Sequence, residues 1–135
     1  MRFFFVLLNR VVNRILRTFG AKRFRGARIL YLTTTGRKSG KARTVPLAYV
    51  RDGDDFVVAA SNGGADWEPA WWLNIQAGGG GTIDVDKQRI QVTASEVEGD
   101  DRARLWRALS DQLDSYDGYQ KKVRRQIAVV RLTPS

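Results

Sequence analysis

Cysteine and histidine are both absent from the 135 residues of the chain. Without them the protein has no disulfide, no thiolate nucleophile, no Ser-His-Asp triad and none of the usual zinc sites. The carboxylates that cluster in the sequence, Asp52, Asp54 and Asp55, flank Gly53 and are typical of a hairpin turn. We therefore expect no metal site. The lack of cysteine agrees with a reducing compartment such as the cytoplasm.

Acidic residues are absent from the first 51 positions, although these carry thirteen of the 23 lysines and arginines. All fourteen aspartates and glutamates follow them, so the net charge of +9 is segregated along the chain. A segregated basic excess marks a face that meets anions, which leaves nucleic acid, an acidic lipid surface and an anionic cofactor as partner classes. A chain of this length with 43% hydrophobic residues is expected to be globular.

Apolar runs long enough to span a bilayer are also missing, and the N-terminal stretch MRFFFVLLNRVVNRILRTFG is too short and too charged to do so. Its apolar residues recur at helical spacing. Two interpretations stay open: residues 1–20 lie as a basic amphipathic helix on an anionic membrane surface, or they pack on the domain core. We expect a helix in residues 1–26, a separate domain in residues 27–135, and a cytoplasmic protein, peripheral on the inner face of the cell membrane under the first interpretation.

Alternating apolar residues predict a β-rich domain from residue 27 onward. The expected strands are residues 27–34, 43–50, 54–61, 82–86, 89–98 and 126–134. The expected helices are residues 69–78 and 99–113, with residues 115–122 as a short helix or turn. Five or six strands with two interspersed helices indicate a mixed β fold with helices, a small and mainly antiparallel barrel.

Turn residues set the expected connections. Asp52 and Gly53 are a strong hairpin signal, and a second hairpin is expected to turn around Lys87 and Gln88. Pro46 lies within a predicted strand, which indicates an edge strand or a bulge. The four glycines of residues 78–81 are expected to form a link that is either mobile or tightly turned.

The most informative stretch is residues 33–47, TTTGRKSGKARTVPL, in which a strand ends, four cations follow and a second strand begins. We call residues 36–43 the basic loop; its cations are Arg37, Lys38, Lys41 and Arg43. Glycines let backbone N–H groups approach an anion whose oxygens guanidinium and ammonium groups neutralise. The alternative is a solvated hairpin tip. The spacing is not that of a P-loop.

Aromatic side chains gather after a second glycine-rich turn, SNGG at residues 61–64. Clustered tryptophans such as Trp67, Trp71 and Trp72 can wall a planar ring system. We expect Trp72 and Leu73 in the core and Trp71, rotated by about 100° on a helix, directed toward the turn or a cleft. Few groups can move protons near neutral pH, which favours a borrowed organic cofactor. The tyrosines that remain for proton chemistry are Tyr49, Tyr116 and Tyr119.

Three stretches carry a resemblance to a known family: TTTGRKSGKARTVPL, then VVAASNGGADWEPAWWLNIQA, then SYDGYQ before a final strand. Over about residues 28–133 the chain resembles the deazaflavin-dependent nitroreductase family. The resemblance implies a split β-barrel and binding of the deazaflavin coenzyme F-420, whose tail bears a phosphate and a polyglutamate. It assigns Arg37, Lys38 and Arg43 to that tail, with Lys41 supporting.

The same resemblance assigns the remaining site residues. It implies that Ser61, Asn62, Gly63 and Gly64 line the deazaflavin ring through backbone groups, and that Trp71 flanks the ring. Tyr116 and Tyr119 would close the substrate side, where a phenol orients or protonates the acceptor.

The resulting expectation is an oxidoreductase that passes hydride from the reduced coenzyme to a quinone, a nitroaromatic or an activated alkene. The N-terminal stretch favours a membrane quinone such as menaquinone, and a homodimer is plausible for barrels of this group. Three alternatives remain: a carrier that binds the coenzyme without turnover, a barrel that binds flavin mononucleotide (FMN), and a nucleic-acid-binding barrel. The last is disfavoured because Asp66 and Glu68 sit among the tryptophans.

Overall fold

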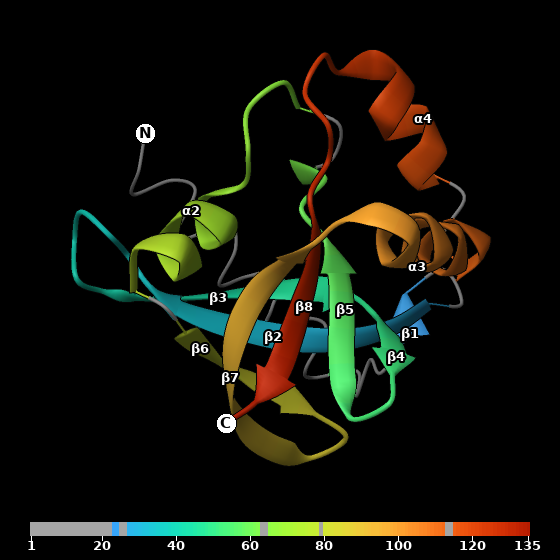
Figure 1. Ribbon diagram of the computed structural model, residues 1–135. Coiled ribbons are helices and arrows are strands. Elements are labelled where there is room, and N and C mark those ends of the chain that lie inside the picture. The colour runs from blue at the N-terminus through green and yellow to red at the C-terminus, as the bar shows by residue number, and fades with distance from the viewer. Residues whose placement is uncertain (1–22, 25–26, 63–64, 79, 113–114) are drawn as a thin grey trace.

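The computed structural model describes residues 23–24, 27–62, 65–78, 80–112 and 115–135, which contain eight strands and three helices (Figure 1). The strands are β1 (Arg23–Phe24), β2 (Ala27–Thr35), β3 (Ala42–Ala48), β4 (Val50–Asp52), β5 (Asp55–Ala59), β6 (Gly80–Val85), β7 (Gln88–Val97) and β8 (Val129–Pro134). The helices are α2 (Ala70–Gly78), α3 (Gly99–Gln112) and α4 (Ser115–Lys122).

Every strand pairing is antiparallel, and the strands follow the spatial order β3-β2-β6-β7-β8-β5-β4, with β1 paired to the start of β2. The two end strands, β3 and β4, are separated in the chain by Tyr49 alone. The sheet therefore curls back on itself, as Figure 1 shows. The predicted mainly antiparallel barrel is confirmed, and Pro46 lies on the predicted edge strand, since β2 is the only partner of β3 among the described strands.

The predicted strand of residues 43–50 is in fact two strands that meet at Tyr49. Its side chain is 2% exposed and packs edge-on against Phe56, with ring centroids 5.5 Å apart. Because the apolar residues run through this point without a break, sequence alone gave no sign of the bend.

The two predicted hairpins are present with small shifts of register. Gly53, with φ of 61°, turns the chain between β4 and β5. The other turn consists of Asp86 and Lys87, with φ values of 48° and 65°, and not of Lys87 and Gln88 as expected. Two successive residues of positive φ form the tight turn that matches the strand twist, and the pairing of Val85 with Gln88 fixes it there.

The glycine link expected at residues 78–81 is wrong for the described residues, because Gly78 ends α2 and Gly80 and Gly81 already belong to β6. A Cβ at Gly81 would lie 2.9 Å from the carbonyl oxygen of Thr33. A Cβ at Gly80 would meet a backbone oxygen of β7 at the same distance. These glycines let β6 approach its neighbours where a side chain would force them apart.

Two apolar cores lie on opposite faces of β5, whose residues alternate between them. Phe56 and Val58 belong to the barrel core, together with Leu30, Leu32 and the side chains of α2. Val57 and Ala59 belong to a second core with α3 and α4. Figure 1 shows α2 on one side of the molecule and α3 and α4 on the other.

Residues 1–22 lie outside the described residues, and the helix predicted there stays a prediction. The sheet begins earlier than expected, since Arg23 and Phe24 already pair with Arg28 and Ala27. Among the described residues, no helix is long and apolar enough to cross a membrane.

Candidate functional site

The basic loop is a tightly hydrogen-bonded turn between β2 and β3. The Gly36 N–H donates to the Lys41 carbonyl and the Gly40 N–H donates to the Gly36 carbonyl, both at 2.8 Å. Gly40 has a φ of 69°, and a Cβ at Gly36 would lie 2.5 Å from the Ser39 hydroxyl oxygen. Gly40 is therefore favoured by the backbone path that presents the cations, whereas a side chain at Gly36 would displace the Ser39 hydroxyl.

The four cations of the basic loop are available to a ligand. Arg37, Lys38 and Lys41 are exposed and Arg43 is half-buried. In the part of the chain that the structure describes, none of them forms an ion pair with a carboxylate. Like charges this close repel one another, and a multivalent anion is the chemical partner that relieves the repulsion.

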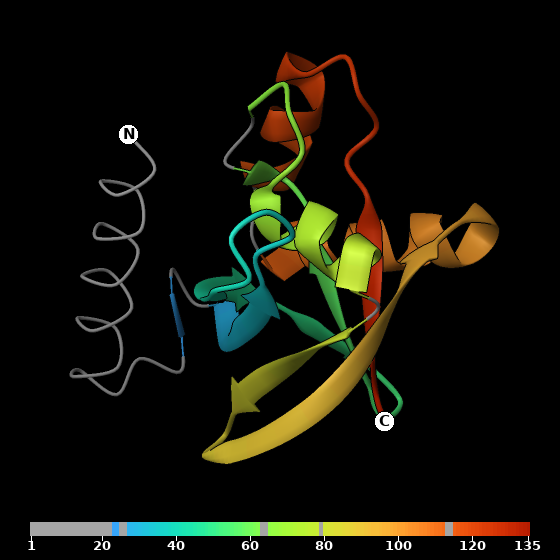
Figure 2. The ribbon, with the colours of Figure 1, turned by 90° about the vertical axis from the view of Figure 1, so that its left-hand side faces the viewer.

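Asn74 of α2 holds the basic loop in place. Its side-chain oxygen accepts a hydrogen bond from the Arg37 N–H at 3.1 Å and a second from the Arg37 guanidinium at 2.9 Å. Asn74 is 5% exposed, so this polar side chain is buried and the two bonds satisfy its oxygen. Figure 2 shows the loop lying against α2. Sequence reasoning missed Asn74, although a lone asparagine within WWLNIQ signals a buried polar group that needs a partner.

Thr34 adds an unsatisfied polar atom next to the basic loop. It is 2% exposed, and its hydroxyl oxygen has no hydrogen-bond partner within the described structure. It lies on the same face of β2 as Leu30 and Leu32, one residue before that strand ends. An orphaned buried hydroxyl beside unpaired cations fits a site that a polar ligand completes.

The turn after β5, residues 60–65, is the second part of the candidate site; we call it the Ser61 turn. Ser61 and Asn62 are half-buried, and Asn62 has a φ of 50°, which asparagine tolerates better than most residues. The Asn62 amide donates to the Trp67 carbonyl at 3.0 Å, and the Ala65 N–H donates to the Asn62 carbonyl at 3.1 Å. The expected ring-lining glycines, residues 63 and 64, lie outside the described residues.

Trp71 was predicted to point toward the turn or a cleft, but the structure buries it. It is 6% exposed and packs beside Trp72, which is 3% exposed, with ring centroids 6.1 Å apart. Leu73, expected in the core, is only half-buried. The predicted orientation of the helix about its axis is wrong, because α2 lies over the barrel core and buries the adjacent positions Trp71 and Trp72 together. Trp67, in contrast, is 72% exposed.

Tyr116 and Tyr119 of α4 lie at the second core. Tyr116 is 5% exposed and contacts the rings of Trp106 and Tyr119, with centroids 6.1 and 6.3 Å away. Burial raises the pKa of Tyr116 to about 12, so its phenol stays protonated near neutral pH and keeps a hydrogen that it can donate to a hydrogen bond. Tyr119 is half-buried and is the more accessible of the two.

Burial likewise raises the pKa of Tyr49, which is enclosed in the barrel core. The structure thus brings Arg37 together with Asn74, and Asn62 together with Trp67. It also encloses two of the three tyrosines that are candidates for proton chemistry. In Figures 1 and 2 the chain after β5 rises between α2 and α4. The Ser61 turn therefore lies between the basic loop on one side and the tyrosines on the other.

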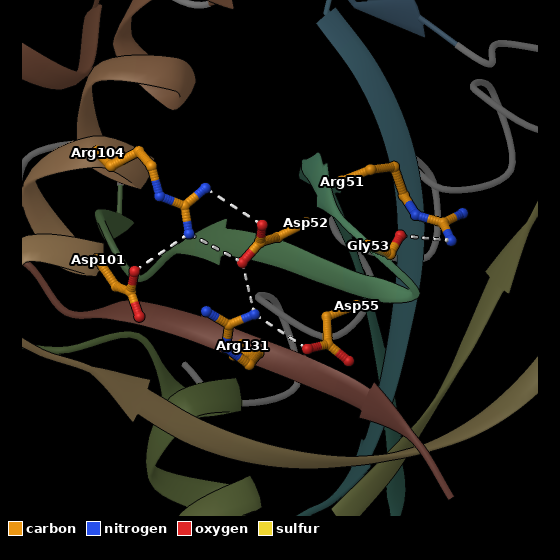
Figure 3. A network of polar contacts seen from close by, with 7 residues as sticks. All are labelled: Arg51, Asp52, Gly53, Asp55, Asp101, Arg104 and Arg131. Carbon is orange, nitrogen blue, oxygen red and sulfur yellow. Dashed lines mark hydrogen bonds and ion pairs between the residues drawn. The ribbon is translucent and has the colours of Figure 1, made fainter.

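A second group of charges lies at the β4–β5 hairpin, drawn in Figure 3. Arg131 of β8 donates to Asp52 at 2.7 Å and to Asp55 at 2.9 Å, and Arg104 of α3 bonds to Asp52 and Asp101 at 3.2 Å. We call these five residues the Asp52 network. Hydrogen bonds from Arg104 and Arg131 lower the pKa of Asp52 to about 2. Asp52 and Asp55 were interpreted as turn residues only, and the sequence gave no sign of their partners.

The described residues contain no group of three or more acidic side chains that could hold a metal ion. The Asp52 network instead ties the β4–β5 hairpin to α3 and β8. It is a structural feature, because each of its carboxylates already faces a guanidinium group.

Known proteins resemble the chain over most of its length. The model of a family described as F420H(2)-dependent quinone reductase matches residues 8–134. A F420H(2)-dependent quinone reductase of Mycobacterium tuberculosis strain H37Rv is 40% identical over 107 residues, which is 77% of this chain and 72% of that protein.

Two solved structures share the fold. One is an F420-H2 dependent reductase with 34% sequence identity and a TM-score of 0.70, over 77% of this chain and 92% of that one. The other is described as a domain-swapped dimer, with 31% identity and a TM-score of 0.72, over 93% of this chain and 96% of that one.

Proposed function

The chain belongs to the F420H(2)-dependent quinone reductase family, and from this premise we propose that it transfers hydride from reduced coenzyme F-420 to a quinone. The expected oxidoreductase and its deazaflavin cofactor agree with this family. The observation that carries the proposal is the basic loop, whose four cations have no carboxylate partner among the described residues. A coenzyme with a phosphate and a polyglutamate tail supplies the missing negative charge.

The tail is the part of the coenzyme that the chain fits best. We assign Arg37, Lys38 and Arg43 to its phosphate and glutamate groups, with Lys41 in support. Arg37 is fixed at two atoms by Asn74, so little conformational entropy is lost when it binds an anion. The lysines are exposed and adapt to the glutamates one at a time.

The ring is assigned to the Ser61 turn. Ser61 and Asn62 carry backbone groups that suit the polar edge of a deazaflavin, and Gly63 and Gly64 complete the assignment. Trp71 is proposed to flank the ring with the small part of its indole that remains exposed. When bound, the coenzyme supplies the hydride, and the protein aligns donor and acceptor and excludes water.

Tyr116 and Tyr119 are proposed to serve the acceptor. A quinone gains a negative oxygen on accepting hydride, and a protonated phenol stabilises that oxygen by donating a hydrogen bond. Tyr119 reaches solvent more readily, whereas Tyr116 contacts an acceptor only when α4 shifts from its present packing.

The natural acceptor is proposed to be menaquinone at the inner face of the cell membrane, approached through the basic residues 1–20. The proposed protein is cytoplasmic and peripheral, and it forms a homodimer as the domain-swapped structural neighbour does. Vesicles with anionic lipid and embedded menaquinone test this step. Deleting residues 1–20 should abolish vesicle binding and slow quinone reduction, while reduction of a water-soluble quinone stays unchanged. Unchanged vesicle binding would remove the membrane part of the proposal.

The central test is calorimetric titration of the protein with oxidised coenzyme F-420 and, in parallel, with FMN at near-physiological salt. We expect selective binding of the deazaflavin, followed by oxidation of the reduced coenzyme when menaquinone is added. Binding of the coenzyme without its oxidation by menaquinone would mean that the protein is a carrier. Absence of binding to either compound would overturn the oxidoreductase assignment.

A further inference from the structure

Arg125, in the segment between α4 and β8, holds the Ser61 turn by three hydrogen bonds. One guanidinium nitrogen donates to the Ala60 carbonyl at 3.1 Å. The other donates to the carbonyls of Ser61 at 3.1 Å and Ala65 at 3.2 Å. A single side chain thus gathers the carbonyl groups from both ends of the turn, 60 to 65 residues away in sequence.

The backbone around Arg125 is fixed by α4. The Gln120 amide donates to the Arg125 carbonyl at 2.8 Å, and the Gln120 side-chain oxygen accepts the Ile127 N–H at 2.8 Å. The guanidinium therefore approaches the turn from a supported position. Gln120 thus links α4, which carries Tyr116 and Tyr119, to Arg125 and through it to the turn.

The charge of Arg125 is not neutralised by a carboxylate within the described ranges of the chain. Its Nε atom is buried and has no hydrogen-bond partner there. A cation that faces only carbonyl oxygens keeps its field, and that field polarises the peptide groups it touches.

The geometry of the peptide unit fixes what the turn presents on its other side. In a trans peptide the carbonyl and the following N–H point in opposite directions. The carbonyls of Ala60 and Ser61 point to Arg125, so the N–H groups of Ser61 and Asn62 point away from it. Neither N–H has a partner among the described residues.

We propose that Arg125 is a positioning residue for the deazaflavin ring, which turns the Ser61 and Asn62 N–H groups outward and strengthens them as donors to the ring's polar edge. This rests on the proposed function. The polar edge of a deazaflavin carries carbonyl oxygens, and the reduced ring gains negative charge there when it ionises. Polarised donors favour that charge, so the site binds the reduced coenzyme in preference to the oxidised one.

The test compares Arg125→Met with Arg124→Met. Arg124 is the neighbouring residue, exposed and without a contact among the described residues, so its replacement makes the same change of net charge. Dissociation constants for oxidised and reduced coenzyme are measured anaerobically for both variants and the wild type. The ionisation pKa of the bound reduced coenzyme is followed by absorbance.

We expect Arg125→Met to weaken binding of the reduced coenzyme about tenfold more than that of the oxidised form, and to raise the pKa of the bound reduced coenzyme. Arg124→Met should change neither quantity. Arg125→Lys keeps the charge with poorer geometry, so both affinities should fall while their ratio stays near that of the wild type.

An unchanged ratio in Arg125→Met, with only a lower melting temperature, would overturn the inference and leave Arg125 a structural residue. If Arg125→Met does not fold, Arg125→Lys decides the same question. That variant keeps the positive charge, so a preference for the reduced coenzyme that is lost in it would contradict the role of the charge. A wild type that binds neither redox form would instead overturn the proposed function, which separates the two failures.

Discussion

The basic loop and the Asp52 network contain the same kind of cation in opposite circumstances. In the loop, four cations lie within seven residues and none has a carboxylate partner in the described structure. In the network, two arginines from α3 and β8 are shared among three aspartates. Matched charges hold elements together, whereas unmatched ones are held in place by the fold and attract a ligand.

The comparison implies that binding and stability are separable in this molecule. Changes in the basic loop should reduce affinity for the coenzyme with little loss of stability, because removing a repelled cation relieves the folded state. Changes in the Asp52 network should do the reverse. A variant that affects both properties equally would break the distinction.

The largest expected effect is on coenzyme affinity in the double variant Arg37→Ala, Lys38→Ala. Two charge-assisted contacts to an anion are lost, so the dissociation constant for coenzyme F-420 should rise about 100-fold. The melting temperature should fall only slightly, because the lost hydrogen bond from Arg37 to Asn74 is partly offset by the relief of charge repulsion. Calorimetric titration and thermal denaturation measure the two properties on the same samples.

The matched control for this pair is Arg107→Ala, Arg124→Ala. It removes two exposed arginines that have no contact among the described residues, and so makes the same change in net charge. Equal loss of affinity in the control would mean that the coenzyme responds to overall charge and not to the basic loop.

A smaller effect on affinity is expected from Asn74→Ala, which removes the acceptor that fixes Arg37. We expect about a tenfold rise in the dissociation constant, since Arg37 must then be ordered by the ligand. Asn74→Asp keeps the contact but pairs Arg37 with a carboxylate, so affinity should fall as well. Gln76→Ala, at an exposed position of the same helix, is the control. Wild-type affinity in Asn74→Asp would refute the view that an unpaired Arg37 is needed.

Arg131→Met tests the other side of the comparison. It leaves Asp52 and Asp55 facing each other across the hairpin without their shared cation, so the melting temperature should fall by a few degrees. Coenzyme affinity should change less than about twofold. Arg89→Met breaks a single ion pair whose arginine is 70% exposed, and it should have a smaller effect. A loss of coenzyme affinity in Arg131→Met would contradict the separation, because it would mean that the Asp52 network also affects binding.

The smallest expected effect is the acid dependence of stability. The pKa of Asp52 lies at about 2 in the folded protein against an ordinary 3.8, so the folded state favours the charged carboxylate. Its contribution is present above pH 3.8 and is lost as the pH falls toward 2. Urea denaturation between pH 5 and pH 2 should show this loss in the wild type and a flatter profile in Asp52→Asn. Asp54→Asn, in the same turn, should keep the wild-type slope.

Local patterns were sufficient to predict most of the strands, the Gly53 hairpin and the cations of the basic loop. These features depend on neighbours in sequence: alternation, glycine at positive φ and charge density. Gly80 and Gly81 were misassigned because glycine composition resembles a loop, whereas their role depends on the Thr33 carbonyl and on β7. The bend at Tyr49 likewise results from closure of the sheet and not from a local signal.

The parts of the candidate site that sequence reasoning missed are the ones with distant partners. Asn74 contacts Arg37 across 37 residues, and Arg125 reaches Ala60 across 65. In the Asp52 network, outside the candidate site, Arg131 likewise reaches Asp52 across 79 residues. A single sequence shows the two side chains of each pair but not that they meet. The exposed cations of the basic loop could therefore be located from the sequence, while the residues that hold them in place could not.

The place of β8 in the sheet has a consequence for how the protein is made. It is the last of the described strands to be synthesised, yet it pairs with both β5 and β7 in the interior of the sheet. During translation β5 and β7 each keep one unpaired edge until β8 has been made. Arg125, which bonds to the Ser61 turn, lies in the segment just before β8. The sheet thus cannot close until β8 has been synthesised, and before that its open edges are exposed to association with another copy.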